Sequence, residues 1–239
     1  MSVSVPEPTT KRVLIACRML EDELSPILDN LPAPLPVVWI DRQLHLVPDN
    51  LKKHLAEAIT RAEDGGAEEI LLAFCLCGNG TEGLCTKKAR LIIPRFDDCI
   101  NMLLCPAIRD RRSFTELGTY YLTRGWTKDP NNAILQALDR IMLDYDHETA
   151  KELIDAIYGS YKKLALIDTG SYRLSSIREY AETVCSHLHL TLDFAEGSTL
   201  YLEKLLAGDW GDSFLVLAPG EPVRMRDFEY GGDSTPHCQ

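Results

Sequence analysis

The stretch EILLAFCLCGNGTEG, residues 69–83, decides the fold class. It starts with a mostly apolar run that is typical of a buried β-strand, and a glycine-rich loop follows directly. Before it, residues 51–62 place leucine, isoleucine and alanine at helical spacing, and Gly65 and Gly66 end that pattern. A helix that leads into a buried strand and a tight loop is the repeating unit of an α/β sheet.

Short apolar runs of the same kind recur along the chain. Strands are expected at residues 12–17, 35–40, 69–75, 91–93, 118–123, 163–167, 190–194 and 214–217, and helices at residues 51–62, 131–145, 147–158, 175–187 and 199–207. Strands that alternate with helices predict mainly parallel sheets with helices packed on their faces. We therefore predict an α/β fold of two Rossmann-like lobes, with mainly parallel sheets and a cleft between the lobes.

The boundaries of the lobes are expected from the same pattern. The segments are a disordered N-terminus (residues 1–11), a first α/β lobe with cysteine-rich strand-end loops (12–128), a helical connection (129–160), a second α/β lobe (161–220) and a polar tail (221–239). The second lobe has fewer expected strands than the first, so its sheet is expected to be the smaller one.

The composition excludes several classes of function. The 239 residues include 25 basic and 36 acidic side chains, which gives a formal net charge of −11. That balance argues against a basic surface for nucleic acid or for an anionic membrane. No apolar run reaches the roughly 18–20 residues that a membrane-spanning helix needs, and the first residues lack the apolar region of a signal peptide. We expect a cytoplasmic protein that binds neither nucleic acid nor membrane.

The cysteines give the most informative pattern for function. Five of the eight lie between residues 75 and 105, and in the cytoplasm such thiols are reduced, metal-bound or reactive. The carboxyl ends of parallel strands meet at one edge of a sheet, where ligands bind. Cys17 ends a predicted strand, and Cys77 and Cys99 each follow one, so we expect the three to converge there.

Three thiolates from separate loops suit a metal site. They can hold zinc or an iron–sulfur cluster and leave one coordination position open for a small molecule. The alternative is that Cys17, Cys77 and Cys99 are core residues, because free cysteine is among the most buried residue types. Cys75 ends its strand and is more typical of core than of a ligand. Whether Cys75 or Cys77 faces the site stays open from spacing alone.

Other side chains near the same edge are candidates for binding substrate. The loop Gly78-Asn79-Gly80 could bring backbone amides close to an anion, although a tight turn without ligand explains it equally well. Arg95 could hold an anionic group of the substrate. His45 follows the second strand and could orient substrate or act as an extra ligand, but a lone histidine is more often structural.

The second lobe carries similar polar residues after its strands. Asp168 could transfer a proton, as a general acid or base. Ser171 and Tyr172 lie in the same loop and could bind a polar ligand. Serine in such a loop is also ordinary helix-capping chemistry, which is the alternative for Ser171.

Several of these stretches together resemble a bacterial and archaeal family known as domain-of-unknown-function family 1638. The matching motifs span residues 12–214 and are Ile15-Ala16-Cys17, Glu23-Leu24, Leu44-His45 with Pro48, Cys77-Gly78-Asn79-Gly80, Pro94-Arg95, Asp98-Cys99-Ile100, and GTYYLT at 118–123 before Gly125-Trp126. The chain departs from the family pattern at Leu76 and in carrying an extra Cys75. By the motif, Cys77 is the residue that faces the site.

The resemblance implies an activity only by association. Members of the family look like neighbours of corrinoid-dependent methyl-transfer systems, which implies one-carbon metabolism and favours a four-iron, four-sulfur (4Fe-4S) cluster over zinc. A corrinoid would come through a partner protein or methyltransferase. The resulting hypothesis is a metal-dependent enzyme, such as a lyase or methyl-transfer enzyme, or an accessory protein that acts on a small molecule. The alternative is a two-lobed module that binds a small metabolite or corrinoid without catalysis.

Overall fold

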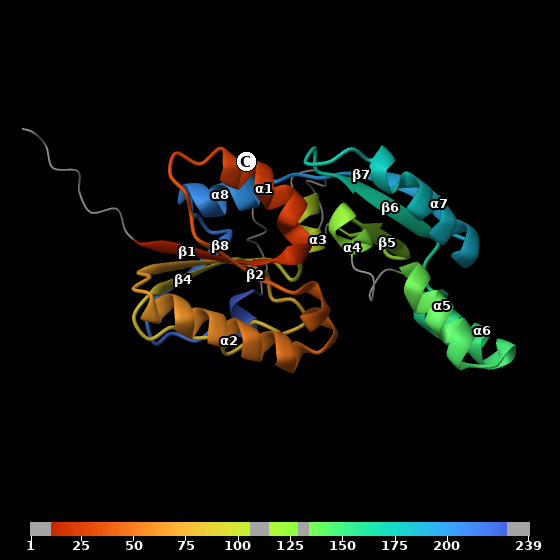
Figure 1. Cartoon of the computed structure of the whole chain (residues 1–239), viewed down its shortest axis with the longest axis horizontal. Helices are drawn as coiled ribbons and strands as arrows, with labels where there is room; N and C mark the ends of the chain where they lie inside the picture. Colours follow the sequence, from red (N-terminus) through yellow and green to blue (C-terminus); the bar gives the residue numbers. More distant parts are fainter. Residues whose placement is uncertain (1–10, 106–114, 129–133, 229–239) are drawn as a thin grey trace, which may run out of the picture.

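The computed structural model describes residues 11–105, 115–128 and 134–228 of the chain. It consists of two α/β lobes that lie side by side, each built around its own sheet (Figure 1). The predicted α/β fold with two Rossmann-like lobes is confirmed. No helix within the described ranges is both long and apolar enough to cross a membrane.

The first lobe contains a mixed sheet of five strands in the order β2-β1-β3-β4-β8. The strands are β1 (Arg12–Cys17), β2 (Val37–Ile40), β3 (Glu69–Ala73), β4 (Arg90–Pro94) and β8 (Phe214–Leu217). The first four strands run parallel, and β8 pairs antiparallel with β4 at the edge. Four parallel strands therefore end at the same side of this sheet.

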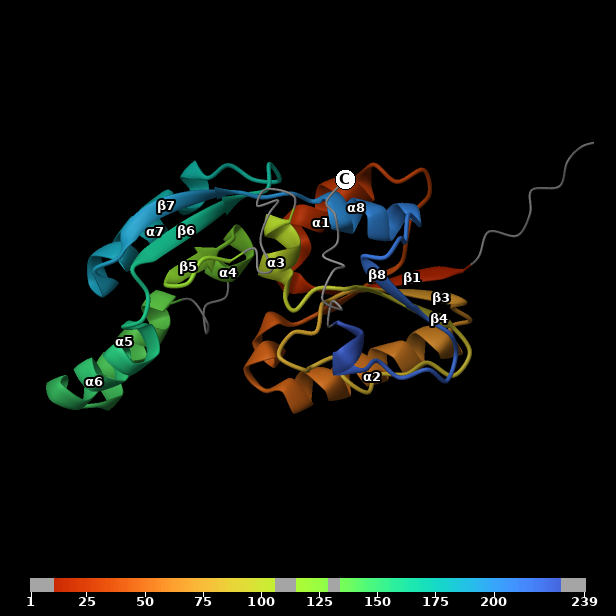
Figure 2. The ribbon, with the colours of Figure 1, turned by 180° about the vertical axis from the view of Figure 1, so that it is seen from behind.

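Helices cover both faces of the first sheet, as Figures 1 and 2 show. One face is covered by α2 (Pro48–Asp64), and the other by α1 (Glu21–Asp29) and α8 (Leu200–Ala207). Short helices complete the lobe: η1 (Arg18–Leu20), η2 (Arg42–Leu46), α3 (Cys99–Leu104) and η3 (Met225–Asp227).

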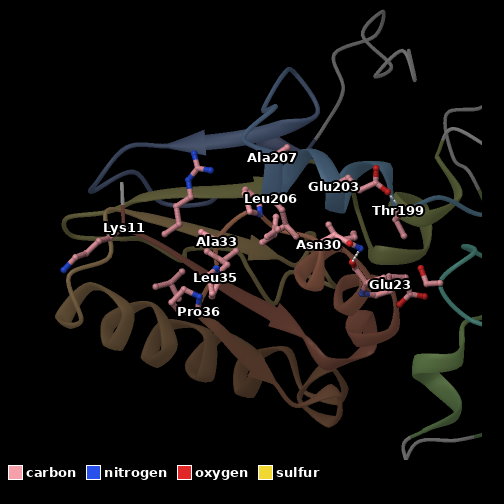
Figure 3. Close-up of a pocket in the computed structure, with 18 of the residues that line it drawn as sticks. Lys11, Glu23, Asn30, Ala33, Leu35, Pro36, Thr199, Glu203, Leu206 and Ala207 are labelled. Carbon is pink, nitrogen blue, oxygen red and sulfur yellow. Dashed lines mark hydrogen bonds between the residues drawn. The ribbon is translucent and has the colours of Figure 1, made fainter. Parts of the chain in front are cut away.

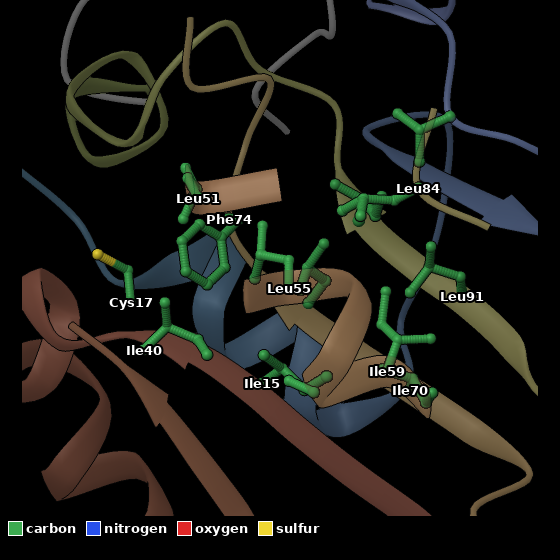
Figure 4. Packing of buried hydrophobic residues seen from close by; sticks show 14 of the residues in the cluster. Ile15, Cys17, Ile40, Leu51, Leu55, Ile59, Ile70, Phe74, Leu84 and Leu91 are labelled. Carbon is green, nitrogen blue, oxygen red and sulfur yellow. The ribbon is translucent and has the colours of Figure 1, made fainter. Parts of the chain in front are cut away.

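The alternation of side chains along each strand divides the core into two layers. In β1, Leu14 packs toward α1 and α8, whereas Ile15 packs toward α2. Figure 4 shows the second layer, where Leu51 and Leu55 of α2 meet the sheet and Cys17 lies near its end. Because both faces are buried, the strands are continuous apolar runs rather than alternating ones.

The second lobe contains a parallel sheet of three strands in the order β5-β6-β7. They are β5 (Thr119–Leu122), β6 (Lys163–Asp168) and β7 (Thr191–Glu196). The remaining helices are α4 (Arg124–Thr127), α5 (Ile134–Asp144), α6 (His147–Tyr158) and α7 (Ser175–Leu188). The helices α5 and α6 extend away from both sheets, whereas α7 lies along β6 and β7 (Figure 1).

Two strands lie in a different sheet from the one expected from sequence. Residues 119–122 pair with β6, so β5 belongs to the second sheet although it precedes the predicted boundary at residue 128. Residues 214–217 return to the first sheet beside β4. Both are short apolar runs that either sheet could accept, and their partners are distant in sequence, so local pattern does not determine the pairing.

Part of the expected polar tail is packed against the first lobe. Val223 is 1% exposed and Phe228 is 3% exposed, and both join the core layer beneath α2. Backbone hydrogen bonds link Val223 to Gly83 and Leu84. The expected disorder of the N-terminus and of the tail after residue 228 concerns segments outside the described residues, apart from Lys11.

The two lobes are joined through α1 and α4. Asp22 of α1 accepts hydrogen bonds from Arg124 and from Lys128 in the second lobe. The approach is so close at Gly125 that an added Cβ atom would lie 2.0 Å from the carbonyl oxygen of Met19. Hydrogen bonds to Asp22 outweigh the effect of its burial and lower the pKa of this carboxyl. Specific contacts between α1 and the segment around α4 therefore hold the two lobes together in this structure.

Candidate functional site

The carboxyl ends of the parallel strands gather the predicted cysteines at one edge of the first sheet. Cys17 is the last residue of β1, Cys77 lies in the loop after β3, and Cys99 begins α3 after β4. The loops after β3 and β4 are held together, because the N–H of Cys77 donates to the carbonyl of Asp97 over 2.9 Å. The strand ends therefore bring the three residues together, as their spacing predicts.

The three thiols influence one another electrostatically. Burial raises the pKa of Cys17 strongly, and Cys99 raises it further. Burial also raises the pKa of Cys77 to about 12, with Cys17 adding to the rise. The pKa of Cys99 is well above its ordinary value because of burial and of Cys77. Burial outweighs the opposing effect of Arg42 on Cys17, so all three side chains are neutral thiols at pH 7.

His45 lies directly beside the first of these thiols. Its Nε2 atom is 3.9 Å from the sulfur of Cys17, and its ring stacks on Phe74 with centroids 5.8 Å apart. Its Nδ1 atom is 3.3 Å from the carbonyl oxygen of Arg42, and a carbonyl can only accept. Burial lowers the pKa of His45, so the ring is neutral. Nδ1 therefore carries the proton, which leaves the lone pair on Nε2, and both nitrogens lie near the Cys17 sulfur, Nδ1 at 4.0 Å and Nε2 at 3.9 Å.

Three thiols and a neutral imidazole are donors that suit a soft metal such as zinc or the iron of a cluster. The chemistry of the donor set therefore fits the predicted group. Their side chains do not form a ready-made coordination shell, because among the described residues no three Cys, His, Asp or Glu side chains are arranged to hold a metal ion. Holding one would require rotation of the thiol side chains toward a common point.

The glycine-rich loop after β3 has the geometry of a tight turn. Three consecutive residues have positive φ: Cys77 (50°), Gly78 (62°) and Asn79 (70°). Gly78 and Asn79 are exposed, whereas Gly80 is buried against α2, where an added Cβ atom would lie 2.6 Å from Leu51. The left-handed backbone turns Cys77 back toward Cys75, whose N–H lies 3.4 Å from the Cys77 sulfur. The turn thereby sets the position of that thiol.

Arg95 is engaged away from the cysteines. Its Nε atom donates a hydrogen bond of 2.5 Å to the backbone carbonyl of Asp227 in η3. Its own backbone N–H donates to Ser213 over 2.7 Å. These bonds connect the loop after β4 to the C-terminal segment. Arg95 therefore has a structural role that was not predicted from the sequence.

The predicted residues of the second lobe lie at the end of β6. Asp168 is exposed, and its carboxylate accepts a hydrogen bond of 3.0 Å from the N–H of Gly170. Tyr172 is buried and donates to the carbonyl of Ile167 over 2.6 Å. Ser171 is half-buried in the same loop. Asp168 and Tyr172 thus close a turn, and this turn faces α1 of the first lobe through Thr169.

Glu23 of α1 is a candidate that the residue-by-residue reasoning missed. It is 0% exposed, and its Oε2 atom is buried without a hydrogen-bond partner among the residues that the structure describes. The hydroxyl of Thr169 lies 3.4 Å from the other carboxylate oxygen. Burial raises the pKa of Glu23 to about 7, and the charge of Asp22 contributes. Its only signal in the sequence is the Glu23-Leu24 motif, because a glutamate in a first helical turn is usually exposed.

The comparisons with known proteins agree with the resemblance seen in the motifs. A family model described as a protein of unknown function, DUF1638, matches residues 39–206. No curated protein and no solved structure matches the chain. The matched region includes two of the three clustered cysteines, His45 and the whole second sheet. It covers well over half of the sequence, and the chain therefore belongs to the DUF1638 family.

Proposed function

We propose that this chain is a metal-dependent protein that acts on a small molecule through a three-cysteine site. Cys17, Cys77 and Cys99 would be the ligands, and an iron–sulfur cluster is favoured over zinc. When bound, such a group supplies an open position that polarises or activates a coordinated substrate. The proposal includes a cytoplasmic location, which the sequence pattern suggests. It also includes a role in one-carbon or corrinoid metabolism and a corrinoid protein or methyltransferase as partner, which derive from the family resemblance.

The convergence of three thiols from separate loops is the observation that supports this proposal. Each of Cys17, Cys77 and Cys99 has its pKa raised by another member of the group. Clustering neutral thiols gives little stability by itself, whereas a cation stabilises their deprotonated forms. An ionisable cluster at the ligand-binding edge of a sheet is a usual mark of function.

The protein's own residues prepare this site in two ways. The neutral ring of His45 can accept the proton of the Cys17 thiol, because Nε2 lies 3.9 Å from its sulfur. The N–H of Met19 points to the same sulfur over 3.4 Å, which stabilises a negative charge there. Both groups favour release of a proton from Cys17 once a positive charge arrives.

A second candidate function is a two-lobed module that binds a small metabolite or corrinoid without catalysis. The neutral state of the buried thiols favours it, because unligated core cysteines have the same properties. In that case Cys17, Cys77 and Cys99 contribute packing only. Hinge motion of two α/β lobes around a ligand is a common arrangement for such modules.

The test is to reconstitute the protein without oxygen, using either zinc or iron with sulfide, and to count bound metal per chain. We expect a double Cys17→Ala, Cys99→Ala variant to lose nearly all tightly bound metal, because one thiol and one imidazole remain. The matched pair Cys75→Ala and Cys77→Ala distinguishes the two neighbouring cysteines. Only Cys77→Ala should weaken binding.

The control is Cys185→Ala, which removes a buried thiol from α7 in the other lobe. It should retain the metal of the unmodified chain. If the double variant binds as much metal as this control, the three-cysteine site is wrong. Metal-free protein that still binds a metabolite would establish the binding module instead.

A further inference from the structure

A cavity of about 1460 Å³ lies on the α1 and α8 side of the first lobe and reaches the second lobe. It extends from Lys11, before β1, along α1 and the loop after it to residues 169–171 of the second lobe. Figure 3 shows Lys11 at one end and Glu23, Thr199 and Glu203 at the other. None of the described cysteines contributes to its lining.

The walls of the cavity are apolar along the middle and acidic at the second-lobe end. Ile27, Leu31, Leu35 and Leu206 contribute aliphatic surface, together with a proline-rich loop at residues 32–36. Such a surface suits the apolar body of a small organic molecule, whose orientation a few polar groups then fix.

Glu23 provides one carboxylate oxygen without a hydrogen-bond partner in the described part of the chain. This atom, Oε2, is buried although the residue lines the cavity, whereas Oε1 lies 3.4 Å from the hydroxyl of Thr169. The neighbouring cations Arg124 and Lys128 are bound to Asp22 instead. A buried carboxylate oxygen without a donor is costly, so a ligand that donates to it gains free energy.

The other carboxylate at this end differs from Glu23. Glu203 is exposed and accepts a hydrogen bond of 2.5 Å from the hydroxyl of Thr199. It adds negative potential to the end of the cavity but leaves no buried oxygen without a donor. At this end Glu203 and the deprotonated form of Glu23 would repel a negatively charged ligand and attract a cationic one, whereas Lys11 lies at the opposite end of the cavity.

We propose that this cavity binds an organic ammonium ion with an apolar body, whose N–H group donates to the buried Oε2 atom of Glu23. The body of the ligand lies against the aliphatic wall of α1 and α8. Binding also connects the lobes, because Glu23 belongs to the first lobe and Thr169 beside it belongs to the second. This site does not depend on metal at the cysteines.

The test uses three fluorescent probes that share a dansyl body. Dansylcadaverine carries a primary ammonium group, its N-acetyl derivative is neutral, and dansyl-6-aminohexanoate carries a carboxylate. Fluorescence titration of the full chain should show dansylcadaverine binding at least ~10-fold more tightly than the other two, because only it forms a charge-assisted hydrogen bond. Equal affinities, tighter binding of the carboxylate or no saturable binding would overturn the proposal.

Variants locate the binding. Glu23→Gln should lower dansylcadaverine affinity at least ~10-fold and leave the acetylated probe unaffected. The matched control Glu203→Gln should change it by no more than about twofold, since that carboxylate is exposed. Ile27→Trp should block all three probes by filling the cavity without altering Glu23. Unchanged binding in both Glu23→Gln and Ile27→Trp would overturn the assignment, whatever the metal content of the cysteine site.

Discussion

The strand ends of the two sheets carry different chemistry although both are built from parallel strands. In the first lobe the loops after β1, β3 and β4 bring together Cys17, Cys77 and Cys99, which are buried or half-buried. In the second lobe, β6 and β7 end at Asp168 and Glu196, which are exposed. Parallel strands place residues at the carboxyl edge of both sheets. The difference is that these residues are buried or half-buried at the first edge and exposed at the second. Exposed Asp168 accepts a hydrogen bond that closes a turn, whereas burial raises the pKa values of the three thiols.

The largest expected effect concerns thiol reactivity at the first edge. In protein stripped of metal by a chelator, Cys77 should react with iodoacetamide at pH 8 roughly 10³-fold more slowly than a thiol of ordinary pKa, because its thiolate is scarce. Exposed Cys85 provides the internal comparison. Mass spectrometry of peptides after a timed pulse measures both rates. Equal labelling of Cys77 and Cys85 would show that burial does not slow the reaction of the Cys77 thiol.

The second prediction concerns the close contact between the two lobes at Gly125. Gly125→Ala should destabilise the protein by more than ~3 kcal/mol, because the new methyl group would collide with the Met19 carbonyl 2.0 Å away. Gly211→Ala is the control, since no atom lies within 4 Å of its added Cβ. Urea denaturation gives both values. Similar stability of the two variants would mean that the lobes are not held at this contact.

The third prediction concerns Glu23, which lies where the two lobes meet. Burial raises its pKa from 4.5 to about 7, so the folded protein binds the proton more tightly than the unfolded chain. Its stabilising contribution is therefore complete below pH 4.5 and is lost as pH rises to about 7. The free energy of unfolding of Glu23→Gln, taken relative to that of the unmodified chain, should therefore rise by about 3 kcal/mol between pH 4 and pH 8.

Urea denaturation at several pH values measures this difference. Glu203→Gln is the matched control, and its free energy of unfolding should depend on pH in the same way as that of the unmodified chain. The pKa of Asp22 is lowered instead, so its contribution to the free energy of unfolding changes in a lower pH range. All these variants retain Asp22. Parallel curves for Glu23→Gln and the unmodified chain would contradict a raised pKa for Glu23.

The smallest effect is expected at the second edge. Asp168→Ala should cost about 0.5–1 kcal/mol, because it removes one exposed hydrogen bond to the N–H of Gly170. Metal binding should not change, since the residue contacts none of the three cysteines. Thermal denaturation and metal analysis of the same preparation check both statements. A loss of bound metal in Asp168→Ala would show that the strand ends of both sheets contribute to one site.

The positions of the cysteines could be predicted because they depend on local pattern. A mostly apolar run identifies each strand, and the residue after it lies at the carboxyl edge when the strands are parallel. Cys17 needed nothing more than this rule, whereas the choice of Cys77 over Cys75 also used the family motif. Cys75 is a core residue as expected, since it is 0% exposed, although β3 ends two residues earlier, at Ala73.

Residues whose environment comes from distant segments could not be predicted. Glu23 is buried only because the loop containing Thr169 packs against α1. Arg95 is engaged by the carbonyl of Asp227, which is 132 residues away in the chain. The strands β5 and β8 pair with partners that local sequence does not specify. In each case the missing information is tertiary packing rather than propensity.

Composition analysis of the native protein tests whether the first edge holds a metal on its thiolates. The protein is purified without oxygen, its absorption spectrum is recorded, and iron, sulfide, zinc and cobalt are measured per chain. We expect broad absorption at ~400 nm with iron and sulfide, or else zinc bound at one ion per chain. Protein that carries none of these metals and binds none on reconstitution would contradict this expectation.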